Sequence, residues 1–112
     1  MKNERNFYID GAWVAPRDGT DFPVYNPATE EVYATISLGG KADAEAAIAA
    51  ARTAFASWSM TTPAERGEVL RAILAVYEKR AQDMAEAISN EMGAPIDMSL
   101  ADQAASGRGH LK

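Results

Sequence analysis

Few residues in this sequence have side chains that could carry out chemistry. Cysteine is absent, and histidine occurs once, at His110. The missing thiol excludes a disulfide, a thiolate zinc site and a cysteine nucleophile within these residues. No motif places a serine or a carboxylate beside His110, so we interpret it as a packing or surface residue. We therefore predict no catalytic residue in this chain.

Two glycine-containing stretches could approach a phosphate group, but neither has the surrounding structure that such a site needs. Gly107-Arg108-Gly109 follows a predicted helix instead of a strand, and it lacks the third glycine of a dinucleotide-binding fingerprint. Gly39-Gly40 follows a predicted strand, but Lys41-Ala42 provides neither a glycine-rich loop nor the Lys-Ser/Thr pair of a P-loop. We interpret Gly39-Gly40 as a linker and predict no cofactor-binding residue.

The composition narrows the kinds of partner. The chain has 112 residues, of which 47% are hydrophobic, and a net charge of −5 from 11 Lys and Arg against 16 Asp and Glu. This size allows one core. The negative charge, without a basic cluster, argues against nucleic acid and anionic membranes as partners. Because no apolar run reaches about 18 residues and no signal-peptide pattern opens the chain, we predict a soluble cytoplasmic protein.

The first part of the chain, residues 1–37, is predicted to form short strands and turns. Asp10-Gly11 lies between aromatic and β-branched residues, which indicates a hairpin with a type I′ turn. A second strand is expected to turn at Asn26-Pro27, because proline fixes its own φ and keeps the preceding residue out of the helical region. Residues 31–36 alternate in polarity, so their strand is expected to bury one face formed by Val32, Ala34 and Ile36.

The second part, residues 43–112, is predicted to form a layer of three to four helices. Asp43 is expected to cap the first helix, whose apolar stripe contains Ala44, Ile48, Ala51, Phe55 and Trp58. Thr62 and Glu65 have the spacing of a capping box at the start of the next helix, with proline between them at the first helical position. Acidic side chains between residues 78 and 91 are interpreted as a solvated helix face.

Glycine and proline divide the rest of the helical pattern. The pattern bends or breaks near Arg80, and Gly93 is expected to end a helix in the left-handed conformation, with Pro95 behind it. A weaker helical segment begins at Asp97 or Ser99 and runs through Ala101, Ala104 and Ala105. No capping signal follows, so we expect a chain truncated after Lys112. Composition and spacing alone predict a soluble, α-rich segment that begins with β-strands and has no active site.

The order of these motifs resembles the amino-terminal end of the aldehyde dehydrogenase superfamily. The matching blocks are Tyr8 to Val14, Phe22 to Val32, Ala47 to Trp58, the Glu65-Arg66 pair and the turn Gly93-Ala94-Pro95. Glu30 departs from the family pattern, which usually has glycine there, and Ala94 stands in place of the usual lysine. The resemblance implies an α/β fold with a Rossmann-type cofactor-binding domain, of which residues 1–112 would form the amino-terminal part.

The resemblance also implies the activity of the intact enzyme. Members oxidise an aldehyde to a carboxylic acid with NAD or NADP. A cysteine thiolate attacks the carbonyl, hydride passes to the nicotinamide, and a water activated by a glutamate cleaves the thioester. These residues lie beyond Lys112 in the family, so the present chain is expected to be an inactive scaffold that binds no cofactor alone. The implied partners are the remainder of the enzyme chain, a small aldehyde, and further subunits in a homodimer or homotetramer.

One binding site carries over to this segment by resemblance. Some members bind a monovalent cation through two backbone carbonyls just before the Asn-Pro pair, which correspond to Val24 and Tyr25. A carboxylate that corresponds to Glu91 completes the site, and such oxygen ligands suit the ion. Because glutamate is longer than the aspartate usual at this place, a plain helix-end carboxylate stays open as the alternative interpretation of Glu91.

Two other interpretations of the whole chain stay open on the sequence alone. The chain could be a stand-alone, non-catalytic module that pairs with other proteins through its apolar helix stripes. Alternatively, it could be one piece of a split enzyme that a second polypeptide completes.

Overall fold

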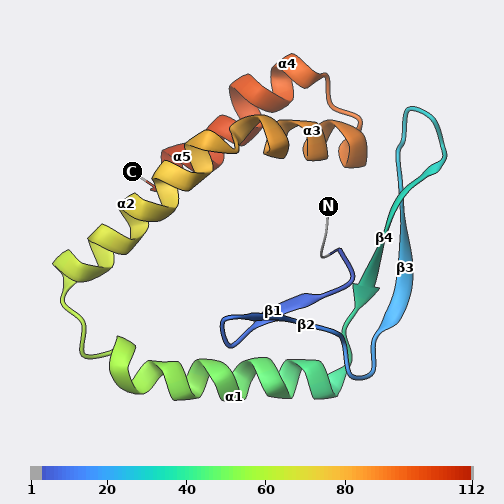
Figure 1. The fold of residues 1–112 in the computed structure, drawn as a ribbon. Coiled ribbons are helices and arrows are strands. Elements are labelled where there is room, and N and C mark those ends of the chain that lie inside the picture. Colours follow the sequence, from blue (N-terminus) through green and yellow to red (C-terminus); the bar gives the residue numbers. More distant parts are fainter. Residues whose placement is uncertain (1–3, 112) are drawn as a thin grey trace. The chain divides into compact units, whose positions relative to one another are not determined.

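The structure, a computed structural model, describes residues 4–111. Met1, Lys2, Asn3 and Lys112 lie outside the described residues, and with them the truncation predicted after Lys112. Strands come first along the chain and helices follow, as predicted (Figure 1). The chain forms two compact units. The first unit contains the residues up to Tyr25 together with Val32–Met60, and the second contains Asn26–Glu31 and the residues from Thr61 onward.

The first unit begins with a hairpin of β1 (Phe7–Ile9) and β2 (Ala12–Val14), which pair in antiparallel register. Asp10 and Gly11 have φ values of 53° and 76°, so the predicted type I′ turn is confirmed. Across the hairpin the rings of Tyr8 and Trp13 meet edge to face at 5.3 Å between their centroids. A hollow of about 340 Å³ lies between the hairpin and four alanines of the first helix, Ala47, Ala50, Ala51 and Ala54.

The second strand pair consists of β3 (Thr20–Tyr25) and β4 (Val32–Leu38), which are antiparallel with a bulge between Val24 and Tyr25. The prediction that β4 buries one alternating face is wrong. Val32 is 53% exposed, and the polar residue Thr35 is as half-buried as Ala34 and Ile36. The half-buried residues of β4, Ala34 to Ser37, are consecutive, so burial depends on position along the strand and does not alternate between its two faces.

Helix α1 (Lys41–Trp58) starts earlier than predicted, so the prediction of Asp43 at the N-cap position is wrong, because Gly40 lies there; Asp43 still caps the helix by accepting from a backbone N–H. Asp43 lies at the third helical position and is 6% exposed. Its carboxylate accepts hydrogen bonds from the backbone N–H of Gly40 at 3.1 Å and from that of Arg17 at 2.7 Å. A side chain at Gly40 would collide with the carboxylate of Asp18, which explains a glycine at this cap.

In the second unit, α2 (Pro63–Lys79) begins with the predicted capping box. The Glu65 N–H donates to the Thr62 hydroxyl at 3.2 Å, and the Thr62 N–H donates to the Glu65 carboxylate at 2.6 Å. The helix breaks at Arg80, and α3 (Ala81–Met92) follows. Gly93 ends α3 with φ at 77°, which confirms the predicted left-handed residue.

The final helical stretch is less regular than predicted. It consists of α4 (Ile96–Met98), the π-helix η1 (Ser99–Ala104) and α5 (Ala105–Leu111) without interruption. The helix continues past Ala105 through Gly107 and Gly109, as the predicted helical layer of residues 43–112 implies. No sequence signal indicated the π-helix, in which hydrogen bonds join residues five apart.

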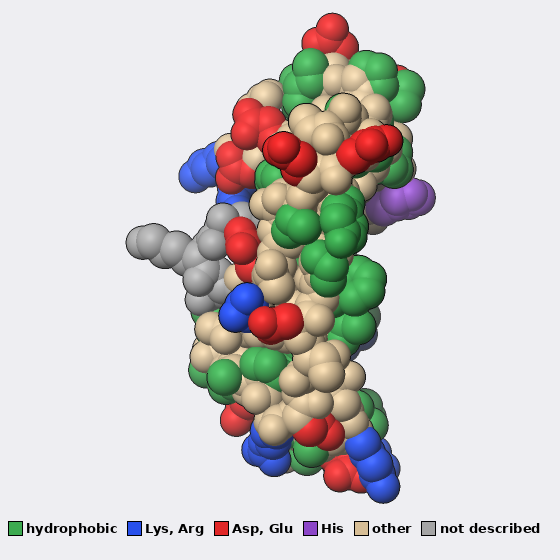
Figure 2. All heavy atoms as spheres, turned by 90° about the vertical axis from the view of Figure 1, so that its right-hand side faces the viewer, with side chains coloured by type: hydrophobic (Ala, Val, Ile, Leu, Met, Phe, Trp, Pro, Cys, Tyr) green, Lys and Arg blue, Asp and Glu red, His purple; other side chains and the backbone are tan. Residues whose placement is uncertain are grey.

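The described residues bury few side chains. The buried hydrophobic residues are Ala85, Ala94 and Ala104, all in the second unit. The predicted stripe of α1 reaches solvent, with Ile48 68% and Phe55 57% exposed, and Figure 2 shows hydrophobic side chains at the surface of the face in view. Within residues 4–111, every helix is too short or too polar to cross a membrane.

Candidate functional site

The turn between β3 and β4 is fixed by the residue that opens it. Asn26 accepts a hydrogen bond through its side-chain oxygen from the backbone N–H of Ala28 at 2.9 Å. Its own N–H donates to the carbonyl of Glu31 at 2.9 Å, and its carbonyl accepts from the N–H of Glu30 at 2.8 Å. An asparagine side chain that imitates a backbone turn in this way is typical of loops. Glu30 adopts φ 61°, a conformation that a residue with a Cβ adopts at some cost.

This turn rests on the end of α3 within the second unit. The side-chain amide of Asn26 donates to the side-chain oxygen of Asn90 at 3.4 Å. A Cβ added at Gly93 would lie 2.8 Å from Cγ of Pro27. Gly93 therefore meets two requirements, the left-handed conformation and the close approach of the turn. The sequence revealed only the first of them, since the partners lie far apart along the chain.

A single carbonyl connects the end of α3 to the last helices. The hydroxyl of Ser89 donates to the carbonyl of Ala94 at 2.8 Å, and the hydroxyl of Ser99 donates to the same carbonyl at 3.5 Å. Ala94 is 7% exposed and Ser99 is fully buried. The segment that corresponds to the predicted Gly-Lys-Pro-like turn is thus held from both sides by serine hydroxyls.

The predicted cation ligands come from two different elements. Val24 and Tyr25 lie at the bulge of β3, in the first unit, while Glu91 is an exposed residue of α3 in the second unit. A bulge disrupts the ladder of backbone hydrogen bonds at that point. Among the described residues, His, Cys, Asp and Glu side chains form no group of three or more that could hold a metal ion. The site of two carbonyls and one carboxylate stays a prediction.

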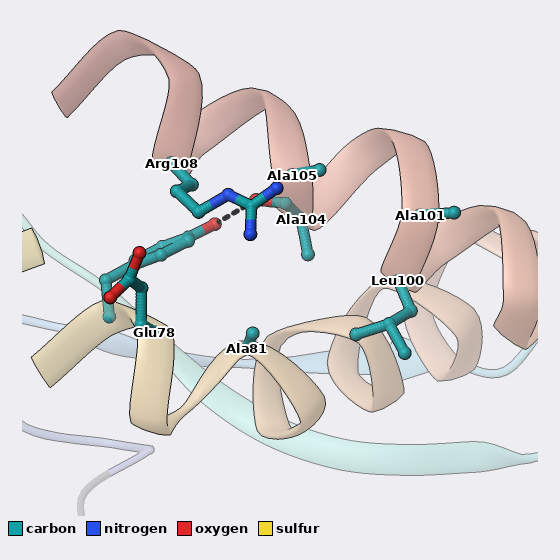
Figure 3. Close-up of a pocket in the computed structure, with 8 residues that line it drawn as sticks. Glu78, Ala81, Leu100, Ala101, Ala104, Ala105 and Arg108 are labelled. Carbon is teal, nitrogen blue, oxygen red and sulfur yellow. Dashed lines mark hydrogen bonds between the residues drawn. The ribbon is translucent and has the colours of Figure 1, made fainter. Parts of the chain in front are cut away.

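A groove of about 280 Å³ lies between α2, α3 and the last helices of the second unit (Figure 3). The hydroxyl of Tyr77 donates across it to the carbonyl of Ala104 at 2.9 Å. Arg108 from α5 and Glu78 from α2 add charged groups to a wall of alanines and Leu100. Gly107-Arg108-Gly109 is helical, as part of α5, so it is no phosphate loop, and the one histidine, His110, is exposed.

Two carboxylates have a pKa that is lowered by hydrogen bonds from the backbone. The N–H of Arg17, together with that of Gly40, lowers the pKa of Asp43, and burial opposes this effect. The backbone N–H and the hydroxyl of Thr62 lower the pKa of Glu65. Both carboxylates hold a helix start in place.

A sequence model of the aldehyde dehydrogenase family matches residues 13–109. Among curated proteins, the chain is 42% identical to a 3-succinoylsemialdehyde-pyridine dehydrogenase from Pseudomonas sp over 99% of its own length and 24% of that relative. It is 39% identical to a putative aldehyde dehydrogenase from Staphylococcus saprophyticus over 88% of its length and 21% of that relative. The chain therefore spans about a quarter or less of the curated relatives it matches.

Solved structures agree with this match. An aldehyde dehydrogenase from Bartonella henselae is 51% identical with a TM-score of 0.95, over 99% of this chain and 23% of that one. A mutant of aldehyde dehydrogenase C from Pseudomonas syringae, in complex with NAD⁺ and octanal, is 44% identical with a TM-score of 0.94, over 97% and 22%. A betaine aldehyde dehydrogenase from Staphylococcus aureus, in complex with NAD⁺, is 34% identical with a TM-score of 0.87, over 97% and 22%. By its sequence and by its fold, the chain belongs to the aldehyde dehydrogenase family, as its motifs predicted.

Proposed function

We propose that this chain forms the amino-terminal scaffold of an enzyme that oxidises an aldehyde to a carboxylic acid with a nicotinamide cofactor. The likeness to the Pseudomonas syringae enzyme, whose structure holds NAD⁺ and octanal, carries this proposal. The chemistry requires a nucleophile, a general base and a cofactor cleft. Since the chain contains no cysteine, the thiolate belongs to the remaining polypeptide of the intact enzyme.

NAD is the cofactor that the similar structures support, and NADP is the alternative. The intact enzyme is expected in the cytoplasm, as a homodimer or homotetramer. Its substrate is a small aldehyde, and the relatives differ in the aldehydes that their names give. The choice among substrates depends on the residues that line the substrate site of the intact enzyme.

The scaffold role explains the apolar faces that reach solvent in the two long helices. Ile48 and Phe55 on α1 and Val76 on α2 are all more than half exposed, which is uncommon for so many large hydrophobic side chains at once. Burial of such faces by further polypeptide would stabilise both partners. A stand-alone interaction module is not favoured, because the family model matches nearly the whole chain as a segment of longer relatives. In a split enzyme, a second polypeptide would have to bury the same apolar faces.

The monovalent cation site at Val24, Tyr25 and Glu91 is part of the proposal. Two observations support it. The bulge lies at the two residues whose carbonyls would bind the ion. In addition, Asn26 and Asn90, which are hydrogen-bonded to each other, are the sequence neighbours of Tyr25 and Glu91. In the full-length protein, Glu91→Gln should reduce the dependence of turnover and thermal stability on potassium or sodium. An unchanged dependence would leave Glu91 as a plain helix-end carboxylate.

The activity is tested with the full-length protein and a panel of aldehydes. We expect formation of reduced nicotinamide with NAD, and a weaker or equal rate with NADP, measured by absorbance. Residues 1–112 alone should form no reduced nicotinamide under the same conditions. Absence of turnover in the full-length protein with every aldehyde tested would contradict the proposed function.

A further inference from the structure

The last helical stretch contains a π-helix, η1, between two α-helical segments. Its hydrogen bonds join residues five apart, whereas those of an α-helix join residues four apart. A π turn therefore takes up about one residue more than an α turn. Ser99 and Ala104, at the two ends of η1, are 0% and 1% exposed, so both face the interior of the second unit. Such runs are rare in proteins, and this one has a contact on α2.

Tyr77 of α2 meets the last helices at two points. Its hydroxyl donates to the carbonyl of Ala104 at 2.9 Å, along the dashed line in Figure 3. A Cβ added at Gly107 would lie 2.5 Å from the hydroxyl oxygen and 2.9 Å from the ring carbon that bears it. The phenol therefore requires a residue without a side chain at the place that Gly107 occupies.

A return of η1 to α-helical hydrogen bonds would shift every later residue. Because an α turn takes up one residue fewer, α5 would turn by about 100° and advance by about 1.5 Å. Ser99 is held in place, since its hydroxyl donates to the carbonyl of Ala94 at 3.5 Å. Each residue of α5 would then lie where the next residue lies now. Ser106 would take the place of Gly107, and its Cβ would collide with Tyr77.

The π register has an unfavourable feature of its own, at Gln103. Its side-chain oxygen is the one buried side-chain polar atom of residues 4–111 for which the structure gives no hydrogen bond. An unpaired buried acceptor destabilises the folded state. In the shifted register, Gln103 would take the place of Ala104, which lines the groove of about 280 Å³ and so has space for a longer side chain beside it. Each register therefore contains one unfavourable contact.

We propose that Tyr77 and Gly107 form a register lock, which keeps the last helices in the π register and excludes a regular α-helix shifted by one residue. The phenol fits only against a residue without a side chain, and its hydrogen bond to Ala104 holds it there. The shift would carry Arg108 from the wall of the groove to the place of Gly109, where an added Cβ meets no atom within 4 Å. The lock thus also keeps a positive charge at the groove. It does not depend on the proposed activity.

Two substitutions in the full-length protein test the lock, with the folding equilibrium constant measured by denaturant. Gly107→Leu blocks the π register and should lower the constant about tenfold or more through overpacking. In the shifted register the new leucine lies where the exposed Arg108 lies now. Ser106→Gly opens that register, so in the Gly107→Leu background it should raise the constant about threefold or more by relieving the overpacking. In the unsubstituted protein, Ser106→Gly should lower the constant about twofold, because glycine disfavours a helix.

Ala105→Gly is the matched control for Ser106→Gly. It has a similar cost in helix propensity, but in the shifted register residue 105 takes the exposed place of Ser106, away from Tyr77. It should lower the constant in both backgrounds. A further fall with Ser106→Gly in the Gly107→Leu background would overturn the proposal, because a helix of fixed register gains nothing from glycine there. A crystal structure of the double variant should show an unbroken α-helix, and a retained π-helix would equally overturn it.

Hydrogen exchange provides a second test if Gly107→Leu does not fold. Tyr77→Phe keeps the ring but removes the oxygen that contacts Ala104 and blocks a Cβ at residue 107. The backbone amides of residues 99–111 should then exchange about threefold to tenfold faster in the full-length protein, because the helix opens more often. Tyr33→Phe on β4, in the first unit, is the control and should leave their exchange unchanged. Unchanged exchange in Tyr77→Phe would overturn the lock.

Discussion

Each of the two units of the chain is stabilised internally by a different kind of contact. The first unit depends on a buried carboxylate, since Asp43 connects the start of α1 to the loop at Arg17, while the large side chains of α1 remain exposed. The second unit buries small residues, namely Ala85, Ala94, Ala104 and Ser99, and the glycines at 93 and 107 leave room for the side chains of Pro27 and Tyr77. A buried carboxylate thus organises the first unit, whereas the second combines close packing of small residues with hydrogen bonds from hydroxyl groups.

This difference predicts different sensitivities. Where a glycine lies against neighbouring atoms, adding a single methyl group should destabilise the folded state, because those atoms have no room to move. A carboxylate that accepts backbone hydrogen bonds stabilises the folded state less when it is protonated. Substitutions in the full-length protein, with unfolding measured by denaturant, test these two sensitivities.

The largest effect is expected for Gly93→Ala in the second unit. The substitution forces a Cβ into the left-handed region at φ 77° and places it 2.8 Å from Cγ of Pro27. The backbone strain alone is worth about 1–2 kcal/mol, and displacement of the turn adds to it, so we expect a loss of about 2–3 kcal/mol in the free energy of unfolding.

Gly109→Ala is the control for this substitution. Gly109 lies in α5 with no atom within 4 Å of an added Cβ, so alanine should leave stability unchanged or raise it by up to about 1 kcal/mol through its helix propensity. Equal destabilisation by both substitutions would show that close packing at Gly93 does not distinguish the second unit.

The first unit should respond most clearly to pH. The N–H groups of Arg17 and Gly40 lower the pKa of Asp43 in the folded protein. A carboxyl group with a lowered pKa contributes stability above its unfolded pKa of about 4, and this contribution is lost as the pH falls through the folded value. Stability should therefore decrease on acidification below about pH 4.

Asp43→Asn should make the unfolding midpoint lower at neutral pH and less dependent on pH in the acid range. Glu65 also has a lowered pKa, at the start of α2, so part of the acid dependence should persist in this variant. A pH profile that Asp43→Asn leaves unaltered would show that the carboxylate does not hold the first unit together.

A smaller effect is expected for Thr62→Ala at the start of α2. The substitution removes the hydroxyl that accepts from the N–H of Glu65 at 3.2 Å, which should lower the free energy of unfolding by about 1 kcal/mol. Thr53→Ala is the matched control in the first unit, because the Thr53 hydroxyl only bonds back to the carbonyl of Ala49 within α1, and alanine favours a helix interior. An equal loss in the two variants would argue against a specific role for the cap.

The features that the sequence predicted well depend on a few neighbouring residues. The turn at Asp10-Gly11, the capping box at Thr62 and the end of α3 at Gly93 each result from local backbone preferences. The features it missed depend on residues distant in the chain. Asp43 pairs with Arg17 across 26 positions, and Asn26 with Asn90 across 64. The π-helix η1 likewise depends on the hydrogen bond from Tyr77 to the carbonyl of Ala104, which no pattern of neighbouring residues predicts.

The smallest effect is expected at Glu30, the residue at which the turn between β3 and β4 departs from the family pattern. Glu30 stands where glycine is usual, and its φ of 61° is the conformation that glycine adopts without strain. Glu30→Gly should relieve about 1 kcal/mol of backbone strain, and the greater freedom of glycine in the unfolded chain should offset part of it. We expect a net gain of about 0.5 kcal/mol by denaturant unfolding. Glu31→Gly, one residue further along, lacks this strain and should be destabilising. A loss of stability with Glu30→Gly would mean that the Glu30 side chain itself stabilises the turn, and that the second unit depends on more than the packing of small residues.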